Sequence, residues 1–134
     1  MNRYVLDACS LIAYLNDEEG AAVIEDLFSS NKEIFMSVVN LYEVCYDAAR
    51  TSGNEHTVVE ILETVRQLPI VVVWEINDEL LQAAARFKVR YRISLADSFA
   101  LGLADVLAAV VVSADHHELE PVEQANGVSL LWFR

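Results

Sequence analysis

Two kinds of hydrophobic pattern alternate along the chain. Short apolar runs are typical of buried strands, and they predict five strands, at residues 2–8, 33–37, 70–75, 108–114 and 127–133. Longer segments carry apolar residues every three or four positions, and they predict six helices, at residues 9–17, 17–30, 38–50, 55–68, 77–91 and 94–107. The polar segment 115–120 predicts a short turn before the last strand, which is expected at an edge of the sheet.

This alternation of strands and helices places the chain in the α/β class. The expected fold is a three-layer α/β/α sandwich, in which helices cover both faces of a central, mainly parallel sheet of four to five strands. No repeat, low-complexity segment or linker interrupts the pattern, so residues 1–134 are expected to form one domain. Ligands of such sheets bind beyond the carboxyl ends of the strands, so the polar residues at those ends are the candidates for function.

Composition narrows the class of protein. Hydrophobic residues make up 54% of the 134 residues and charged residues 22%, which is typical of a globular domain. No apolar run reaches the roughly 18 residues that suggest a membrane span, so no membrane association is expected. Asp7 lies where a signal peptide would be apolar, which predicts an unprocessed, cytoplasmic protein. In that compartment Cys9 and Cys45, both in apolar helical patterns, are expected to be reduced and buried.

The charge of the chain is strongly negative. The net charge of −12 comes from 9 Lys and Arg against 21 Asp and Glu, which argues against a phosphate-binding surface over the whole molecule. A nuclease is still compatible with this charge, because cations held by clustered acids reverse the local field. Four of the basic residues lie in one short run, namely Arg86, Lys88, Arg90 and Arg92. This run is either a solvated helix end or a local patch that contacts RNA or a protein partner.

Four acids occupy positions from which they can meet. Asp7 ends the first predicted strand, and Asp115 directly follows the fourth. Asp97 lies in the first turn of helix 94–107, and Glu43 lies in the middle of helix 38–50. If the first and fourth strands are neighbours, Asp7 and Asp115 point into one crevice, which the other two acids can reach from flanking helices.

Three of these acids also have a purely structural interpretation as helix caps. Asp7 can cap the helix that follows it. Ser94 and Asp97 have the spacing of a capping box, in which Asp97 would accept a hydrogen bond from the backbone N–H of Ser94. Asp115 and Glu118 have the same spacing. Taken singly, each of these acids can be explained without a ligand.

Glu43 is harder to explain as a structural residue. No Lys or Arg lies three or four positions from it, and an unpaired buried carboxylate is costly, so the alternative is a surface position. Considered together, four crowded carboxylates repel one another, and one of them would protonate unless a cation lies between them. Mg²⁺ or Mn²⁺ is the natural cation, because both prefer oxygen ligands, and such an ion can activate water against a phosphodiester.

Four segments resemble, in the same order and spacing, the motifs of a known family: "VLDACSLIAYL", "VVNLYEV", "SLADSFALGLA" and "VVSADHHEL". They resemble the four motifs of PIN-domain proteins, above all the VapC-type toxins, over nearly the whole chain. The resemblance implies that Asp7, Glu43, Asp97 and Asp115 are catalytic residues that bind Mg²⁺ or Mn²⁺. It also implies an endoribonuclease that acts on RNA, usually as a homodimer, and that a cognate antitoxin protein holds inactive.

Three further side chains are candidates for supporting these acids. The family often has a small polar residue two positions after the first acid. Here that position is Cys9 and the hydroxyl comes one residue later, at Ser10, so either side chain can support Asp7. Ser113 occupies a position where the family often has threonine, and its hydroxyl can make the same hydrogen bonds. Asn40 lies one helical turn before Glu43 and can face the same pocket.

Two other functions are compatible with the sequence. The chain can be a catalytically weak PIN-like scaffold that acts through protein–protein interaction, with its acidic surface and apolar helices binding a partner. It can also be a phosphoryl-transfer domain with Asp7 as the nucleophile. The last alternative lacks support, because no second acid follows Asp7 by two residues and no glycine-rich phosphate loop is present.

Overall fold

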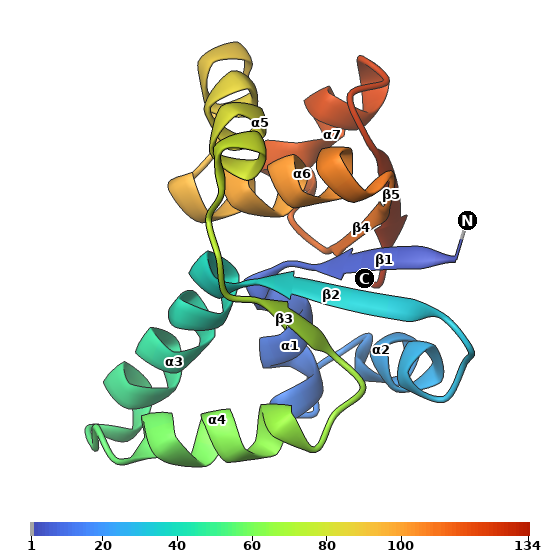
Figure 1. Ribbon diagram of the computed structural model, residues 1–134. Helices are drawn as coiled ribbons and strands as arrows, with labels where there is room; N and C mark the ends of the chain where they lie inside the picture. Colours follow the sequence, from blue (N-terminus) through green and yellow to red (C-terminus); the bar gives the residue numbers. More distant parts are fainter. Residues whose placement is uncertain (1) are drawn as a thin grey trace.

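The fold is built on one parallel sheet, seen edge-on in Figure 1, in a computed structural model that describes residues 2–134. The strand order is β3-β2-β1-β4-β5, and every neighbouring pair is parallel. The strands are β1 (Arg3–Leu6), β2 (Glu33–Ser37), β3 (Val71–Val73), β4 (Val110–Ser113) and β5 (Ser129–Trp132). The predicted class and the edge position of the last strand are confirmed.

Seven helices in the described part of the chain cover the two faces of the sheet. They are α1 (Ala8–Leu15), α2 (Ala21–Phe28), α3 (Val38–Ser52), α4 (Thr57–Arg66), α5 (Asp78–Arg90), α6 (Leu95–Leu107) and α7 (His116–Gln124). Helices α1 to α4 lie on one side of the sheet and α5 to α7 on the other, so the three-layer α/β/α sandwich is confirmed (Figure 1).

The hydrophobic core has two halves because side chains alternate between the faces of each central strand. Val5 and Val111 pack with the buried side chains of α5, α6 and α7. Leu6 and Val112, the next residues along, pack with those of α1, α2 and α3. All four side chains are fully buried. The central strands therefore carry continuous apolar sequence, which is the signal that predicted them.

The prediction of a short turn at residues 115–120 is wrong, because this segment begins α7. The Asp115 side chain caps the helix by accepting the backbone N–H of Glu118 at 3.2 Å. Leu119 and Val122, three positions apart, are fully buried against the sheet. Proline is unfavourable in a helix interior, so Pro121 argued against a helix in the sequence. In the structure Pro121 is tolerated in the second turn of α7.

Helices α5 and α6 approach each other closely at Gly102, on the same helix as Asp97. A Cβ atom at this position would lie 2.7 Å from the backbone N and 2.9 Å from the Cα of Ala84 on α5. Real Cβ atoms do not come so close to backbone atoms, so only glycine allows this helix spacing. The contact fixes α6 against α5 and thereby fixes where the first turn of α6 lies.

We expect Gly102→Ala to lower the free energy of unfolding by about 1–3 kcal/mol, because the added methyl group forces the two backbones apart. Urea denaturation followed by circular dichroism measures the change. Helix propensity alone would give the opposite sign, a gain of about 0.5–1 kcal/mol for alanine over glycine. A stabilised Gly102→Ala variant would therefore contradict the close packing.

Candidate metal centre

The pairing of β1 with β4 brings two of the predicted acids to one edge of the sheet. Leu6 lies opposite Val112, and the backbone N–H of Asp7 donates to the carbonyl oxygen of Val112 at 3.3 Å. Asp7 and Asp115 therefore follow neighbouring strands at their carboxyl ends. The condition on which the sequence prediction depended, that the first and fourth strands are neighbours, is met.

Three carboxylates form a tight group at this edge. Oxygen atoms of Asp97, Asp115 and Glu118 all lie within 4.8 Å of one another. Asp7 and Glu43 lie outside this trio but are coupled to it. Besides burial, which is the largest cause of each shift, the negative charge of Asp7 raises the pKa of Asp97, and the charges of Asp7 and Glu118 raise the pKa of Glu43. The structure thus brings the four predicted acids into one electrostatic neighbourhood and adds Glu118, which the sequence prediction did not include.

Glu118 is held in the group by the start of α6. The backbone N–H of Ser94 donates to Glu118 Oε2 at 3.2 Å. The Ser94 hydroxyl accepts the backbone N–H of Asp97 at 3.1 Å, so the first half of the predicted capping box is confirmed. The second half is wrong, because Glu118 and not Asp97 receives the N–H of Ser94. Asp97 is therefore free to turn toward the other acids.

The crowding of the trio shows in the pKa of Asp97. Burial of this side chain, the hydrogen bond to Glu118 and the charges of Asp7, Glu118 and Asp115 raise the pKa of Asp97 to about 9. The same hydrogen bond lowers the pKa of Glu118. At neutral pH a protonated Asp97 thus donates to an ionised Glu118, and one proton relieves the repulsion that a divalent cation would otherwise relieve.

Asp7 is nearly inaccessible to solvent, with 2% of its surface exposed, and this burial raises its pKa. Several donors oppose the effect. The backbone N–H of Ser10 donates to Asp7 Oδ1 at 2.9 Å, and the Cys9 Sγ lies 3.2 Å from both carboxylate oxygens. Cys9 and Ser10 therefore both support Asp7, and Ser10 Oγ also donates to its carbonyl oxygen at 2.8 Å. Cys9 and Cys45 are both free thiols, as expected, but only Cys45 is buried, whereas Cys9 is half-buried beside Asp7.

Ser113 and Asn40 connect the elements that carry the acids. Ser113 Oγ accepts the backbone N–H of Asp115 at 3.0 Å, and its hydrogen bond to Asp7 lowers the pKa of that carboxyl. Asn40, fully buried on α3, donates through Nδ2 to the carbonyl oxygen of Ala96 at 3.1 Å. Its Oδ1 has no hydrogen-bond partner among residues 2–134. Such an orphaned acceptor is costly in a core. Ala96, which accepts the other hydrogen bond of Asn40, is the residue before Asp97.

Glu43 is the exposed member of the predicted acids, so the surface position considered from the sequence is the one found. It lines an open hollow of about 370 Å³ between α3 and the start of α6. Partial desolvation, followed by the charges of Asp7, Asp47 and Glu118, raises its pKa. The side chain therefore belongs to the rim of the acidic site rather than to its buried centre.

The basic run at the end of α5 has divided roles. Arg86 pairs with Asp105 at 2.8 Å, and Lys88 Nζ donates to the carbonyl oxygen of Ile93. The charge of Lys88 lowers the pKa of Glu118, so this side chain lies near the acidic site. Arg90 and Arg92 are exposed. A contact of this run with RNA or a partner stays a prediction.

Comparisons with known proteins agree with this geometry. The family model of the PIN domain matches residues 4–122. The chain belongs to the PIN domain family. No curated protein matches the chain significantly in sequence. No helix in the described residues of this PIN domain has the length and hydrophobicity that a membrane crossing requires.

Solved structures share the fold of this PIN domain over essentially its whole length. VapBC2 from Rickettsia felis, bound to a promoter DNA fragment, has a TM-score of 0.72 at 14% identity, covering 97% of this chain and 98% of that chain. DNA-bound VapBC from Salmonella typhimurium gives 0.71 at 17% identity, with both chains fully covered. FitAcB from Neisseria gonorrhoeae gives 0.68 at 15% identity, with 96% of each chain covered. Because the sequence identities are so low, the structural likeness establishes the fold alone.

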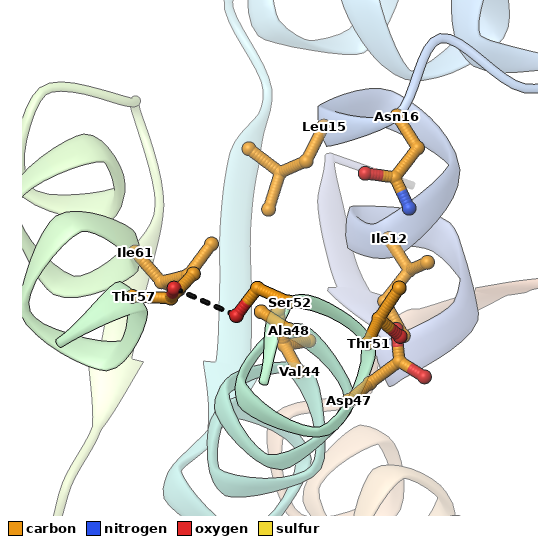
Figure 2. Close-up of a pocket in the computed structure, with 10 residues that line it drawn as sticks. All are labelled: Ile12, Leu15, Asn16, Val44, Asp47, Ala48, Thr51, Ser52, Thr57 and Ile61. Carbon is orange, nitrogen blue, oxygen red and sulfur yellow. Dashed lines mark hydrogen bonds between the residues drawn. The ribbon is translucent and has the colours of Figure 1, made fainter. Parts of the chain in front are cut away.

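A second hollow of this PIN domain lies away from the acid trio. It has a volume of about 350 Å³ and opens between α1, α3 and α4 (Figure 2). Apolar side chains such as Ile12, Leu15 and Ile61 dominate its wall, and a hydrogen bond of 2.9 Å joins the hydroxyls of Ser52 and Thr57. Asp47 is its single carboxylate. This hollow lacks the converging acids that define the candidate metal centre.

The raised pKa of Asp97 predicts a stability that depends on pH. The unfolded chain loses this proton near the ordinary pKa of 3.8, whereas the folded chain keeps it to about 9. Between these values the folded state binds more protons, so the free energy of unfolding falls as pH rises. We expect metal-free Asp97→Asn to melt at a higher temperature than the wild type at about pH 8, with the difference shrinking toward about pH 4.

Differential scanning calorimetry in the presence of a chelator measures both melting temperatures. Asp26→Asn, which removes an exposed carboxylate on α2, is the matched control and should show no such trend. A difference between Asp97→Asn and wild type that stays constant with pH would contradict the proton shared by Asp97 and Glu118.

Proposed function

We propose that this PIN domain is a Mg²⁺- or Mn²⁺-dependent endoribonuclease and the toxin component of a type II toxin–antitoxin pair. The observation that carries the proposal is the convergence of Asp97, Asp115 and Glu118 within 4.8 Å, next to the buried Asp7. An all-oxygen set of this kind suits a hard divalent cation better than zinc. When bound, such a cation activates water and stabilises negative charge on a phosphodiester.

The donor set fits a divalent cation in two further respects. The pKa of Asp97 is raised and that of Glu118 is lowered, which marks a place where the protein does not fully balance the negative charge of the trio by itself. The orphaned Oδ1 of Asn40 is a spare acceptor on the link between α3 and the first turn of α6. Asp7, Asp97, Asp115 and Glu43 would hold the ion, as the sequence prediction has it, together with Glu118.

The protein's own groups prepare the site for this chemistry. Ser10, Cys9 and Ser113 direct hydrogen bonds at Asp7, which keeps its carboxylate oriented in a nearly dry pocket. Asp97 has to release its proton before it can act as a ligand, so activity should rise with pH through the neutral range. Glu43, on the exposed rim, would contribute its carboxylate to the bound cation from the side that is open to solvent.

The proposed partners follow from the structural neighbours. Those neighbours include a toxin–antitoxin complex from Klebsiella pneumoniae and a member of the VapBC family of toxin–antitoxin systems from Mycobacterium tuberculosis, and by analogy this chain would bind a cognate antitoxin protein. RNA as the substrate, the homodimer and the cytoplasmic location come from the family resemblance or the sequence and remain proposals. A short neighbouring reading frame that encodes a DNA-binding protein would support the antitoxin assignment.

A catalytically weak scaffold that acts through protein–protein interaction is the second candidate function. The observation in its favour is a set of exposed apolar side chains that includes Val89, with 87% of its surface exposed, and Tyr42, with 68% exposed. Such side chains often mark interaction surfaces. Partner binding without cleavage of any RNA would favour this alternative.

We expect the purified chain to cleave single-stranded RNA when Mn²⁺ or Mg²⁺ is added and to be inactive in a chelator. Asp7→Asn and Asp97→Asn should each reduce the rate by at least roughly a hundredfold, because each removes a proposed ligand. Gel analysis of a labelled RNA pool measures the rates. Cleavage by both variants at the wild-type rate would refute the site, and no cleavage by the wild type would favour the scaffold.

We expect Glu118→Gln to weaken Mn²⁺ binding by roughly tenfold or more, because the ion loses a ligand from the trio. Isothermal titration calorimetry measures the affinity without relying on turnover. Glu120→Gln is the matched control, since Glu120 is an exposed acid on the same helix that pairs with His116 at 2.9 Å. Equal Mn²⁺ affinity of Glu118→Gln and wild type would remove Glu118 from the proposed site.

A further inference from the structure

Lys88 makes a different kind of contact from several other basic residues of the chain. Four of those residues pair with carboxylates, namely Arg3, Arg50, Arg86 and Arg134. The Lys88 ammonium instead reaches from the last turn of α5 into the short connection to α6, where it donates to the carbonyl oxygen of Ile93. Helix α6 begins two residues later and carries Asp97 in its first turn. The contact therefore lies directly before the acidic site.

The peptide group that joins Ile93 to Ser94 is held at both of its polar ends. Its carbonyl oxygen accepts the Lys88 ammonium, and its N–H, which belongs to Ser94, donates to Glu118 Oε2 at 3.2 Å. A trans peptide is planar, so its C=O and N–H point in opposite directions. A cation therefore lies at the negative end of the peptide dipole and an anion at its positive end, and each contact strengthens the other.

The same peptide group influences where two members of the acid trio lie. Ser94 binds Glu118 through its N–H, and its hydroxyl accepts the backbone N–H of Asp97 at 3.1 Å. A shift of Ser94 would thus move both carboxylates, whose oxygen atoms lie within 4.8 Å of one another. Ser94 is exposed, so water competes for its hydrogen bonds unless a further contact holds its backbone. Lys88 supplies that contact.

The electrostatics of Glu118 agree with this chain of contacts. The hydrogen bond from Asp97 is the largest cause that lowers the pKa of Glu118, and the N–H of Ser94 and the charges of His117 and Lys88 lower it further. An ionised Glu118 accepts the N–H of Ser94 more strongly than a neutral one would. The link joins the three helices that lie together on one face of the sheet, α5, α6 and α7 (Figure 1).

Two simpler roles for Lys88 make different predictions. Lys88 and Arg90 both lie in the last turn of α5, where a cation stabilises a helix through its dipole, so loss of either charge should have the same effect. A purely long-range effect has the opposite sign from positioning, because removing a cation near three carboxylates should tighten the binding of a divalent cation. Positioning predicts weaker binding, and it predicts this for Lys88 but not for Arg90.

We propose that Lys88 is a positioning residue of the candidate metal centre, which holds the Ile93–Ser94 peptide group so that Ser94 keeps Asp97 and Glu118 in place for the ion. The inference rests on the proposed metal-dependent function and assigns a part in it to the end of α5. Lys88 acts through Ser94 and not as a ligand, because an ammonium group has donors but no acceptor for a cation.

Isothermal titration calorimetry with Mn²⁺ tests the proposal without relying on turnover. We expect Lys88→Met to weaken Mn²⁺ binding by roughly tenfold, since methionine keeps the apolar stem but removes the donor that orients the ligands. Lys88→Arg should retain the affinity, because a guanidinium can donate to the same carbonyl oxygen. Arg90→Met is the matched control, since it removes an exposed cation from the same helix turn.

Amide hydrogen exchange of Ser94, followed by NMR in the presence of a chelator, tests the link without any metal. We expect the exchange rate of this N–H to rise roughly fivefold or more in Lys88→Met, because its hydrogen bond to Glu118 opens more often. Lys88→Arg and Arg90→Met should leave the rate unchanged.

Several outcomes would overturn the proposal. Equal or tighter Mn²⁺ binding by Lys88→Met does so, and so does an equal loss of affinity in Arg90→Met. An unchanged exchange rate of the Ser94 amide in Lys88→Met also does so. If the wild type binds no Mn²⁺, the proposed metal-dependent function fails, and the exchange rate of Ser94 then decides separately whether Lys88 holds this peptide group.

Discussion

The parallel pairing of β1 with β4 is the contact on which the acidic site depends. It joins residues near the two ends of the sequence, with Tyr4 opposite Val110 and Leu6 opposite Val112. The chain leaves both strands at the same edge of the sheet, and there Asp7 and Asp115 follow. The helices then supply the remaining carboxylates, α6 through its first turn and α7 through Glu118. Without this pairing the acids would belong to unrelated helix starts.

The same carboxylate side chain can cap a helix and also serve as a ligand to a cation. Asp7 caps α1 through the N–H of Ser10, and Asp115 caps α7 through the N–H of Glu118. A carboxylate has two oxygens and several lone pairs, so one oxygen can accept a backbone N–H while the other faces the site. The cap fixes the side chain in one orientation, which is what a ligand to a small cation requires.

Most of the fold was predictable because its signals are local. Buried strands such as β4 are continuous apolar runs, and helices such as α3 show their period directly. Helix α7 escaped prediction because its apolar positions are few and Pro121 interrupts them. Glu118 was recognised from the sequence only as a possible capping partner of Asp115, because its place beside Asp97 depends on how α7 packs against the start of α6.

The electrostatic state of the site was predictable only in outline. Repulsion among crowded carboxylates follows from their positions, but which of them keeps a proton depends on burial. Asp97 is buried and hydrogen-bonded to Glu118, so its pKa rises, whereas the sequence alone treats all four predicted acids alike. The exposure of Glu43 is likewise a property of how α3 packs, because its helical neighbours include both buried and exposed side chains.

The central place of β1 in the sheet has a consequence for how the protein is made. A ribosome releases β1 (Arg3–Leu6) long before β4 (Val110–Ser113), so Asp7 emerges well before Asp115 and Glu118. Until β4 arrives, one side of β1 lacks its neighbour, and the carboxylates of the site cannot gather. An incomplete nascent chain therefore lacks the assembled acidic site, and the proposed nuclease activity would be confined to chains whose synthesis is nearly finished.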